Sequence, residues 1–121
     1  MSEALLMLDK LEQILIDVAR NCDTITYLKL AQRLGLQPPH TIHQAAELVE
    51  TLMRLHAETG TPQLASVVIS RSRGGLPAPG YFILLSELGL YSGSVDGEDA
   101  REFHAQEKQR LQSELRRKTA L

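Results

Sequence analysis

Two arginines, Arg71 and Arg73, stand at the first edge of a segment rich in glycine and proline that runs to Gly80. Guanidinium groups bind phosphate oxygens, and they also enter narrow minor grooves of DNA. Gly74 and Gly75 have no side chain, so another molecule can approach the backbone closely there. These residue types in this order predict a loop that contacts a nucleic-acid backbone.

A second group of candidate nucleic-acid contacts lies nearer the N-terminus. Lys29 and Arg33 are about one helical turn apart, and we expect both to bind phosphates. His40, His43 and Gln44 fall around the expected start of a later helix, from which glutamine can pair with adenine in the major groove. The alternative for these three side chains is a solvated first helical turn that binds nothing.

No spacing in the chain is typical of a catalytic or metal centre. His40 and His43 are close in sequence, but no cysteine or carboxylate accompanies them at ligand spacing, and a structural zinc site needs four ligands. The sequence identifies no Ser-His-Asp triad and no pair of catalytic carboxylates. We therefore expect a protein that is not an enzyme and that holds neither a cofactor nor a metal.

The single cysteine, Cys22, excludes an internal disulfide. It continues the apolar positions Leu15 and Val18 and is followed by Asp23, a setting that does not activate a thiol. We expect Cys22 to be buried and unreactive.

Length and composition are typical of one globular domain. The chain has 121 residues, of which 43% are hydrophobic and 23% are charged. No apolar run approaches the roughly 20 residues that span a bilayer. Glu3 and Asp9 without a basic segment before them do not resemble a secretory signal, so we expect a cytoplasmic protein without a membrane contact.

The overall charge argues weakly against a nucleic-acid partner. The formal net charge is −2, whereas a dedicated DNA-binding protein usually has a basic face. Towards the C-terminus, acidic residues come first and Arg116, Arg117 and Lys118 come last, an order that complements a helix dipole. The alternative is that these three bases add phosphate contacts.

Hydrophobic periodicity indicates the elements that would position these residues. Intervals of three and four predict helices over residues 3–21, 26–34, 41–59 and 98–118. Ser2 is a candidate cap of the first helix, Thr24 or Thr26 of the second and Thr41 of the third, and Gly35 and Gly60 are expected to end two of them. Residues 64–70 and 81–85 predict two strands around the loop at 71–80.

The order of three helices, a strand, a loop and a second strand is typical of a winged helix-turn-helix domain. We expect an α+β, mostly helical fold with a two-stranded antiparallel β-hairpin as the wing and with flanking N- and C-terminal helices. Residues 1–90 would form the winged-helix-like domain, and residues 91–121 a linker and a charged C-terminal helix.

Parts of the chain resemble the DNA-binding domain of alkylguanine alkyltransferases and alkyltransferase-like proteins. The segment from Ile25 to Leu36 is similar to the opening of that family's helix-turn-helix, with a Thr-Tyr pair, Leu before Ala and a later Gly. The family's strand and glycine-rich wing are similar to Ser66-Val67-Val68-Ile69 followed by Gly74, Gly75, Leu76, Gly80 and Tyr81. The resemblance covers about residues 25–82 and implies a winged helix that binds DNA.

Two departures limit what the resemblance implies. The family's reactive enzymes have Pro-Cys-His-Arg where this chain has Leu64-Ala65-Ser66-Val67, so alkyl transfer to that strand is excluded. Residues 40–45 hold no arginine in place of the one that the family inserts into the DNA stack.

The sequence therefore favours a small non-catalytic protein that binds double-stranded DNA, with transcription regulation as its expected role. The broad apolar face of the first helix, widened by Leu6, Met7 and Ile14, predicts a homodimer. Glu47 and Glu50 on the third helix would repel phosphates. The alternative is a protein-interaction module on the same scaffold, with the Gly/Pro loop as a recognition element and no role in binding DNA.

Overall fold

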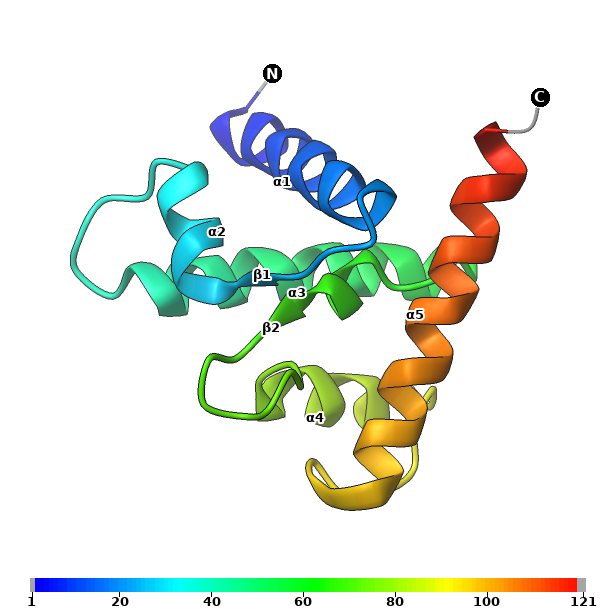
Figure 1. Ribbon diagram of the computed structural model, residues 1–121. Coiled ribbons are helices and arrows are strands. Elements are labelled where there is room, and N and C mark those ends of the chain that lie inside the picture. Colours follow the sequence, from blue (N-terminus) through cyan, green and yellow to red (C-terminus); the bar gives the residue numbers. More distant parts are fainter. Residues whose placement is uncertain (1, 120–121) are drawn as a thin grey trace.

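The computed structural model describes residues 2–119, and helices make up most of that range. A 3-10 helix leads into one of two short strands, and the other strand directly precedes the second α-helix (Figure 1). The elements in chain order are α1 (Glu3–Arg20), β1 (Ile25–Thr26), α2 (Tyr27–Arg33), α3 (Thr41–Thr59), η1 (Leu64–Val67), β2 (Val68–Ile69), α4 (Pro79–Glu87) and α5 (Gly97–Thr119).

The helices form a stack with one helix standing beside it. Figure 1 shows α1 above α3 and α3 above α4, while α5 runs along one side of the molecule past all three. Helix α2 packs against α3, and η1 lies at the centre, in contact with α1, α3 and α5. The chain from α2 to α4 is thereby wrapped around one core.

The predicted β-hairpin wing is wrong. The two strands pair in parallel, with Ile25 opposite Val68 and Thr26 opposite Ile69. Only two residues of the strand expected at 64–70 are extended, and the strand expected at 81–85 lies inside α4. Among residues 2–119 the place of the wing is taken by an irregular segment, residues 70–78, which we call the β2–α4 loop.

Local signals explain why residues 81–85 are helical. Pro79 occupies the first helical turn, where its fixed φ favours a helix and its missing N–H is not needed. Gly89 follows the helix with a φ of +76°, a left-handed conformation that commonly ends helices. A run of five apolar residues has too little periodicity to distinguish a strand from a buried helix.

The four helices expected from periodicity are confirmed to within one residue at each end. Ser2 caps α1, since its hydroxyl accepts a hydrogen bond from the Leu5 N–H. Of the two candidates for α2, Thr26 is the cap, and its hydroxyl accepts from the Lys29 N–H at 3.2 Å.

The expected cap of α3 is wrong. Thr41 is the first residue of the helix, and His40 occupies the capping position in a left-handed conformation, with a φ of +61° and no capping bond from its side chain. Gly35 and Gly60 take the positive φ angles expected for residues that end helices.

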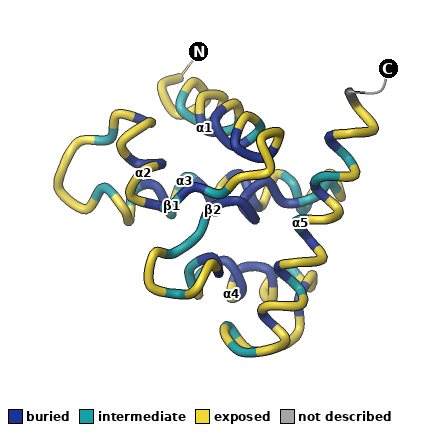
Figure 2. The backbone as a smooth tube through the Cα atoms, in the orientation of Figure 1, coloured by how far each residue is buried: buried dark blue, intermediate teal, exposed yellow. Residues whose placement is uncertain are grey.

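The core lies between the stacked helices, as Figure 2 shows by the buried positions at the centre of the molecule. Leu11, Leu30, Met53 and Phe82 are fully buried there. Cys22, expected to be buried, is exposed instead. Helix α1 ends before it, and the turn that follows carries Cys22 away from the apolar face of the helix.

Helix α5 lies across the domain. One of its faces packs on η1 and α1 and buries Ala100, Leu111 and Leu115, together with His104 and Glu107. The division of the chain at residue 90 stays a prediction.

Candidate nucleic-acid interface

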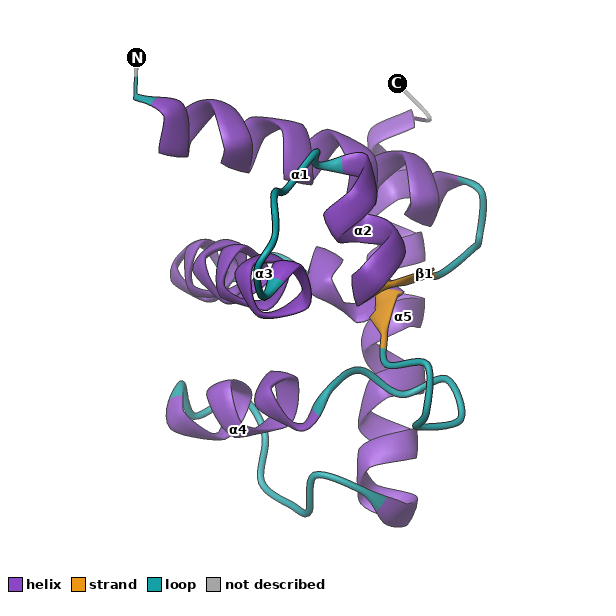
Figure 3. Cartoon of the chain, turned by 90° about the vertical axis from the view of Figure 1, so that its left-hand side faces the viewer, coloured by secondary structure: helices purple, strands orange, loops and turns teal. Residues whose placement is uncertain are grey.

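Three segments with candidate contacts share one face of the molecule. In Figure 3, which turns this face towards the viewer, α2, the turn into the start of α3, and the β2–α4 loop all lie in front. Helix α2 also packs directly on α3. Segments some 40 residues apart in the chain thus lie on the same side of the molecule.

Three of the predicted phosphate contacts are exposed. Lys29 and Arg33 belong to α2 and Arg71 to the β2–α4 loop, two of the segments that lie on this face. None of the three takes part in an ion pair within residues 2–119. Their charges are therefore available to an anionic partner.

Acidic residues are absent from the segments that build this face. No Asp or Glu occurs from residue 24 to 46 or from residue 59 to 86. These two segments hold four basic residues and no acidic one, whereas the rest of the chain holds nine basic and fifteen acidic residues. The overall charge of −2 therefore hides a local excess of positive charge, and this signal could have been found in the sequence from the spacing of its Asp and Glu residues.

The two histidines at the start of α3 are both exposed. His43 Nε2 lies 3.0 Å from Glu47 Oε1 one helical turn away, so a protonated His43 would form an ion pair with it. His40 precedes the helix in its left-handed conformation and makes no capping bond.

Gln44 is occupied by the turn before α3. Its Nε2 donates to the carbonyl oxygens of Gln37 at 2.9 Å and Pro39 at 2.8 Å. In this conformation its amide hydrogens hold the turn rather than face a base edge. A contact between Gln44 and adenine stays a prediction that needs these bonds to break.

Arg73 also has an internal role. Its Nε donates to the Pro77 carbonyl at 2.8 Å, and its Nη2 donates to the carbonyl of Val95 before α5. The side chain is half-buried and ties the β2–α4 loop to the segment at residues 91–96. Arg73 therefore shapes the loop from which Arg71 extends.

Tyr27, which no sequence motif marks as a contact, joins α2 to the β2–α4 loop. The Ala78 N–H donates to the Tyr27 hydroxyl at 3.2 Å, so the end of the β2–α4 loop is held against the start of α2. Burial raises the pKa of Tyr27, which keeps the hydroxyl protonated.

The acidic residues of α3 differ in position. Glu50 is half-buried, and a Cβ placed on Gly80 would lie 3.2 Å from its Oε2, so this carboxylate faces the start of α4. Glu47 is exposed beside His43. The first turn of α3 is free of acidic residues, and Glu47 and Glu50 follow it, so a DNA contact would be restricted to the start of the helix.

Residues 2–119 contain no group of three or more His, Cys, Asp or Glu side chains that could hold a metal ion. No helix in the same range is long and apolar enough to cross a membrane. Comparison with known protein families, curated proteins and solved structures finds no match for this chain.

Proposed function

We propose that this protein binds double-stranded DNA without catalysis, through α2, the start of α3 and the β2–α4 loop. The observation that supports the proposal is that Lys29, Arg33 and Arg71 are exposed, outside any ion pair within residues 2–119, and lie in two segments, residues 24–46 and 59–86, that hold no acidic residue. Transcription regulation and a cytoplasmic location stay predictions.

Binding would rest mainly on phosphates. Each phosphate that a Lys or Arg neutralises releases condensed cations. The logarithm of the binding constant therefore falls with the logarithm of the salt concentration, with a slope of about 0.9 per phosphate contact. For Lys29, Arg33 and Arg71 together, this predicts a loss of affinity of about 40-fold when salt rises from about 50 to about 200 mM. His40 and His43, beside them, would lie nearest to the groove.

The test is a fluorescence-anisotropy titration of a labelled mixed-sequence duplex at several salt concentrations. The triple variant Lys29→Ala, Arg33→Ala, Arg71→Ala should lower the salt slope by about 2.7. A matched control removes the same charge from outside the face, at Lys10 and Arg20 on α1 and Arg101 on α5, and should bind like the wild type. Absence of binding at low salt, or equal losses in both variants, would contradict the proposal.

Helix α1 favours a second function, that of a protein-interaction module or homodimer. Leu5 and Leu6 are 54% and 50% exposed on its first turns, an unusual position for two adjacent leucines. Sedimentation at micromolar concentration tests this alternative, since replacing both leucines with Glu would dissociate a dimer that buries them. A wild type that sediments as a monomer would exclude the homodimer.

A further inference from the structure

Backbone hydrogen bonds close the β2–α4 loop at its base. The Ser70 N–H donates to the Leu76 carbonyl at 2.8 Å. Within this closure the Arg73 N–H donates to the Ser70 carbonyl, and the Leu76 N–H donates to the Arg73 carbonyl, both at 3.2 Å. Leu76 and Pro77 are buried, whereas Arg71 is exposed. The loop is therefore a defined unit, and the position of Arg71 depends on how that unit is attached to the rest of the molecule.

Two side-chain hydrogen bonds attach the loop to different parts of the fold. Arg73 Nη2 donates to the Val95 carbonyl in the segment before α5, while its Nε donates to the Pro77 carbonyl at 2.8 Å. At the end of the loop, the Ala78 N–H donates to the Tyr27 hydroxyl of α2 at 3.2 Å. The Arg73–Val95 bond spans 22 residues of the chain and the Tyr27–Ala78 bond spans 51, so neither is a local turn contact.

Both attachments can be removed without a change in charge. The planar guanidinium of Arg73 presents five N–H donors in fixed directions, so it bonds two carbonyl oxygens at once. Lysine has the same charge but only one ammonium group on a flexible stem, so Arg73→Lys does not reproduce this fork. Tyr27→Phe removes only the hydroxyl that accepts from Ala78.

Attachment of the loop before binding matters because of conformational entropy. An arginine on a mobile loop has to be ordered when it contacts a phosphate, and ordering the backbone of one residue weakens binding by about fivefold or more. A loop that is already held avoids this loss, which is the advantage of preorganisation. Arg71 therefore gains affinity from bonds that it does not itself make.

We propose that Arg73 and Tyr27 are positioning residues that hold the β2–α4 loop, and with it Arg71, in a fixed place before DNA binds. The inference rests on the proposed function, in which Arg71 contacts a phosphate. Arg73, predicted from the sequence as a direct phosphate contact, acts here through the loop.

The first measurement uses the free protein and does not depend on DNA. In the wild type, ¹⁵N relaxation of the backbone amides of Ser72 and Gly74 should give order parameters near the rigid value of about 0.85. In Arg73→Lys and in Tyr27→Phe these order parameters should fall below about 0.6. Unchanged order parameters in both variants would overturn the proposal.

The second measurement is the anisotropy titration of the mixed-sequence duplex. Arg73→Lys and Tyr27→Phe should each weaken binding by about fivefold at about 50 mM salt, although neither changes the net charge. In the Arg71→Ala background neither substitution should have a further effect, because the loop then has no phosphate contact to position. A direct contact by Arg73 predicts a different result, since lysine also binds phosphate and Arg73→Lys would keep the wild-type affinity.

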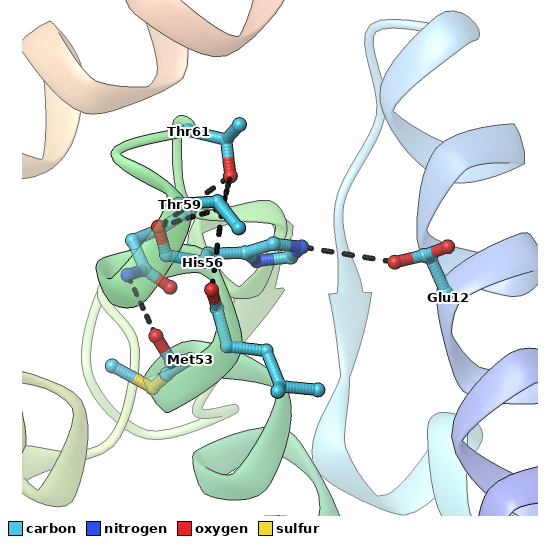
Figure 4. A network of polar contacts seen from close by, with 7 residues as sticks. Glu12, Met53, His56, Thr59 and Thr61 are labelled. Carbon is cyan, nitrogen blue, oxygen red and sulfur yellow. Dashed lines mark hydrogen bonds and ion pairs between the residues drawn. The ribbon is translucent and has the colours of Figure 1, made fainter.

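Two control variants remove similar groups away from the loop. Arg110→Lys alters an arginine that also donates within the protein, to Glu107 Oε1 at 2.7 Å, but belongs to α5. Thr59→Val removes a hydroxyl that donates to the His56 carbonyl at 3.3 Å, in the network that Figure 4 shows at the end of α3. Thr59 is the last residue of α3, whereas the proposed DNA contact involves its start. Both controls should bind DNA like the wild type.

The outcomes separate this inference from the proposed function. Equal losses of affinity in the variants and the controls, or losses that persist in the Arg71→Ala background, would overturn the positioning role. Wild-type affinity in both Arg73→Lys and Tyr27→Phe would overturn it as well. A wild type that binds no duplex would contradict the proposed function, and the order parameters would then decide by themselves whether Arg73 and Tyr27 hold the loop.

Discussion

A buried hydroxyl pair at the centre of the fold offers a sharp test of the packing. Ser66 Oγ and the Tyr81 hydroxyl lie 2.6 Å apart, with Ser66 0% and Tyr81 2% exposed. The pair joins η1 to α4. His104 of α5 contacts the same serine through its Nε2, which lies 2.7 Å from the Ser66 carbonyl oxygen.

Removing either hydroxyl leaves the other one buried without a partner. Ser66→Ala and Tyr81→Phe should therefore each lower the free energy of unfolding by about 1–3 kcal/mol. For a chain of 121 residues, this corresponds to a fall in Tm of about 4 °C per kcal/mol. The double variant removes both polar groups and leaves neither hydroxyl unpaired. Its decrease in the free energy of unfolding should therefore be smaller than the sum of the two single decreases by about 1–3 kcal/mol.

The assay is urea unfolding followed by circular dichroism, with the denaturant slope compared among variants. Tyr91→Phe is the control, because the Tyr91 hydroxyl donates to the carbonyl of an exposed residue, Ser94, where water can replace it. The free energy of unfolding of Tyr91→Phe should fall by less than about 1 kcal/mol. Strictly additive losses for Ser66→Ala and Tyr81→Phe would refute the reasoning.

Two further predictions concern pH and the turn after α2. Burial lowers the pKa of His104 and of His56 below the ordinary 6.5, so the unfolded chain binds more protons than the folded one as the pH falls through that value. The free energy of unfolding should therefore decline below about pH 6.5. In the His104→Gln variant, the urea midpoint should fall less steeply with decreasing pH than in the wild type. A variant with an equally steep profile would contradict the assignment to His104. Gly35 has a φ of +71° and free space around it, so Gly35→Ala should lower Tm by about 4 °C through the backbone alone. An unchanged Tm would show that the turn can relax.

The sequence by itself determined the helices whose signals are local. Helix α3 was predicted with its observed ends because its apolar residues recur every three or four positions over 19 residues. Ser2 and Thr26 could be identified as caps because a capping bond reaches only three residues along the chain. The basic side chains that could contact a partner were also identifiable from the sequence, since Lys and Arg are usually exposed.

The tertiary structure decided what depends on partners far away in the chain. The parallel pairing places Ile25 beside Val68, and no local pattern shows that two such short segments will meet. The helical state of residues 81–85 is favoured when Tyr81 and Phe82 bury their rings against the rest of the core.

The same reason applies to the candidate site. Arg73 and Gln44 are polar residues in exposed segments by sequence, yet each is engaged by backbone carbonyls, one of them at Val95. Arg71, two residues away, remains exposed. Folding brings hydrogen-bond acceptors within reach of some polar side chains, and only the remaining side chains are available to a partner. These acceptors lie on segments that are held together only by the packed core, so the sequence alone does not identify them.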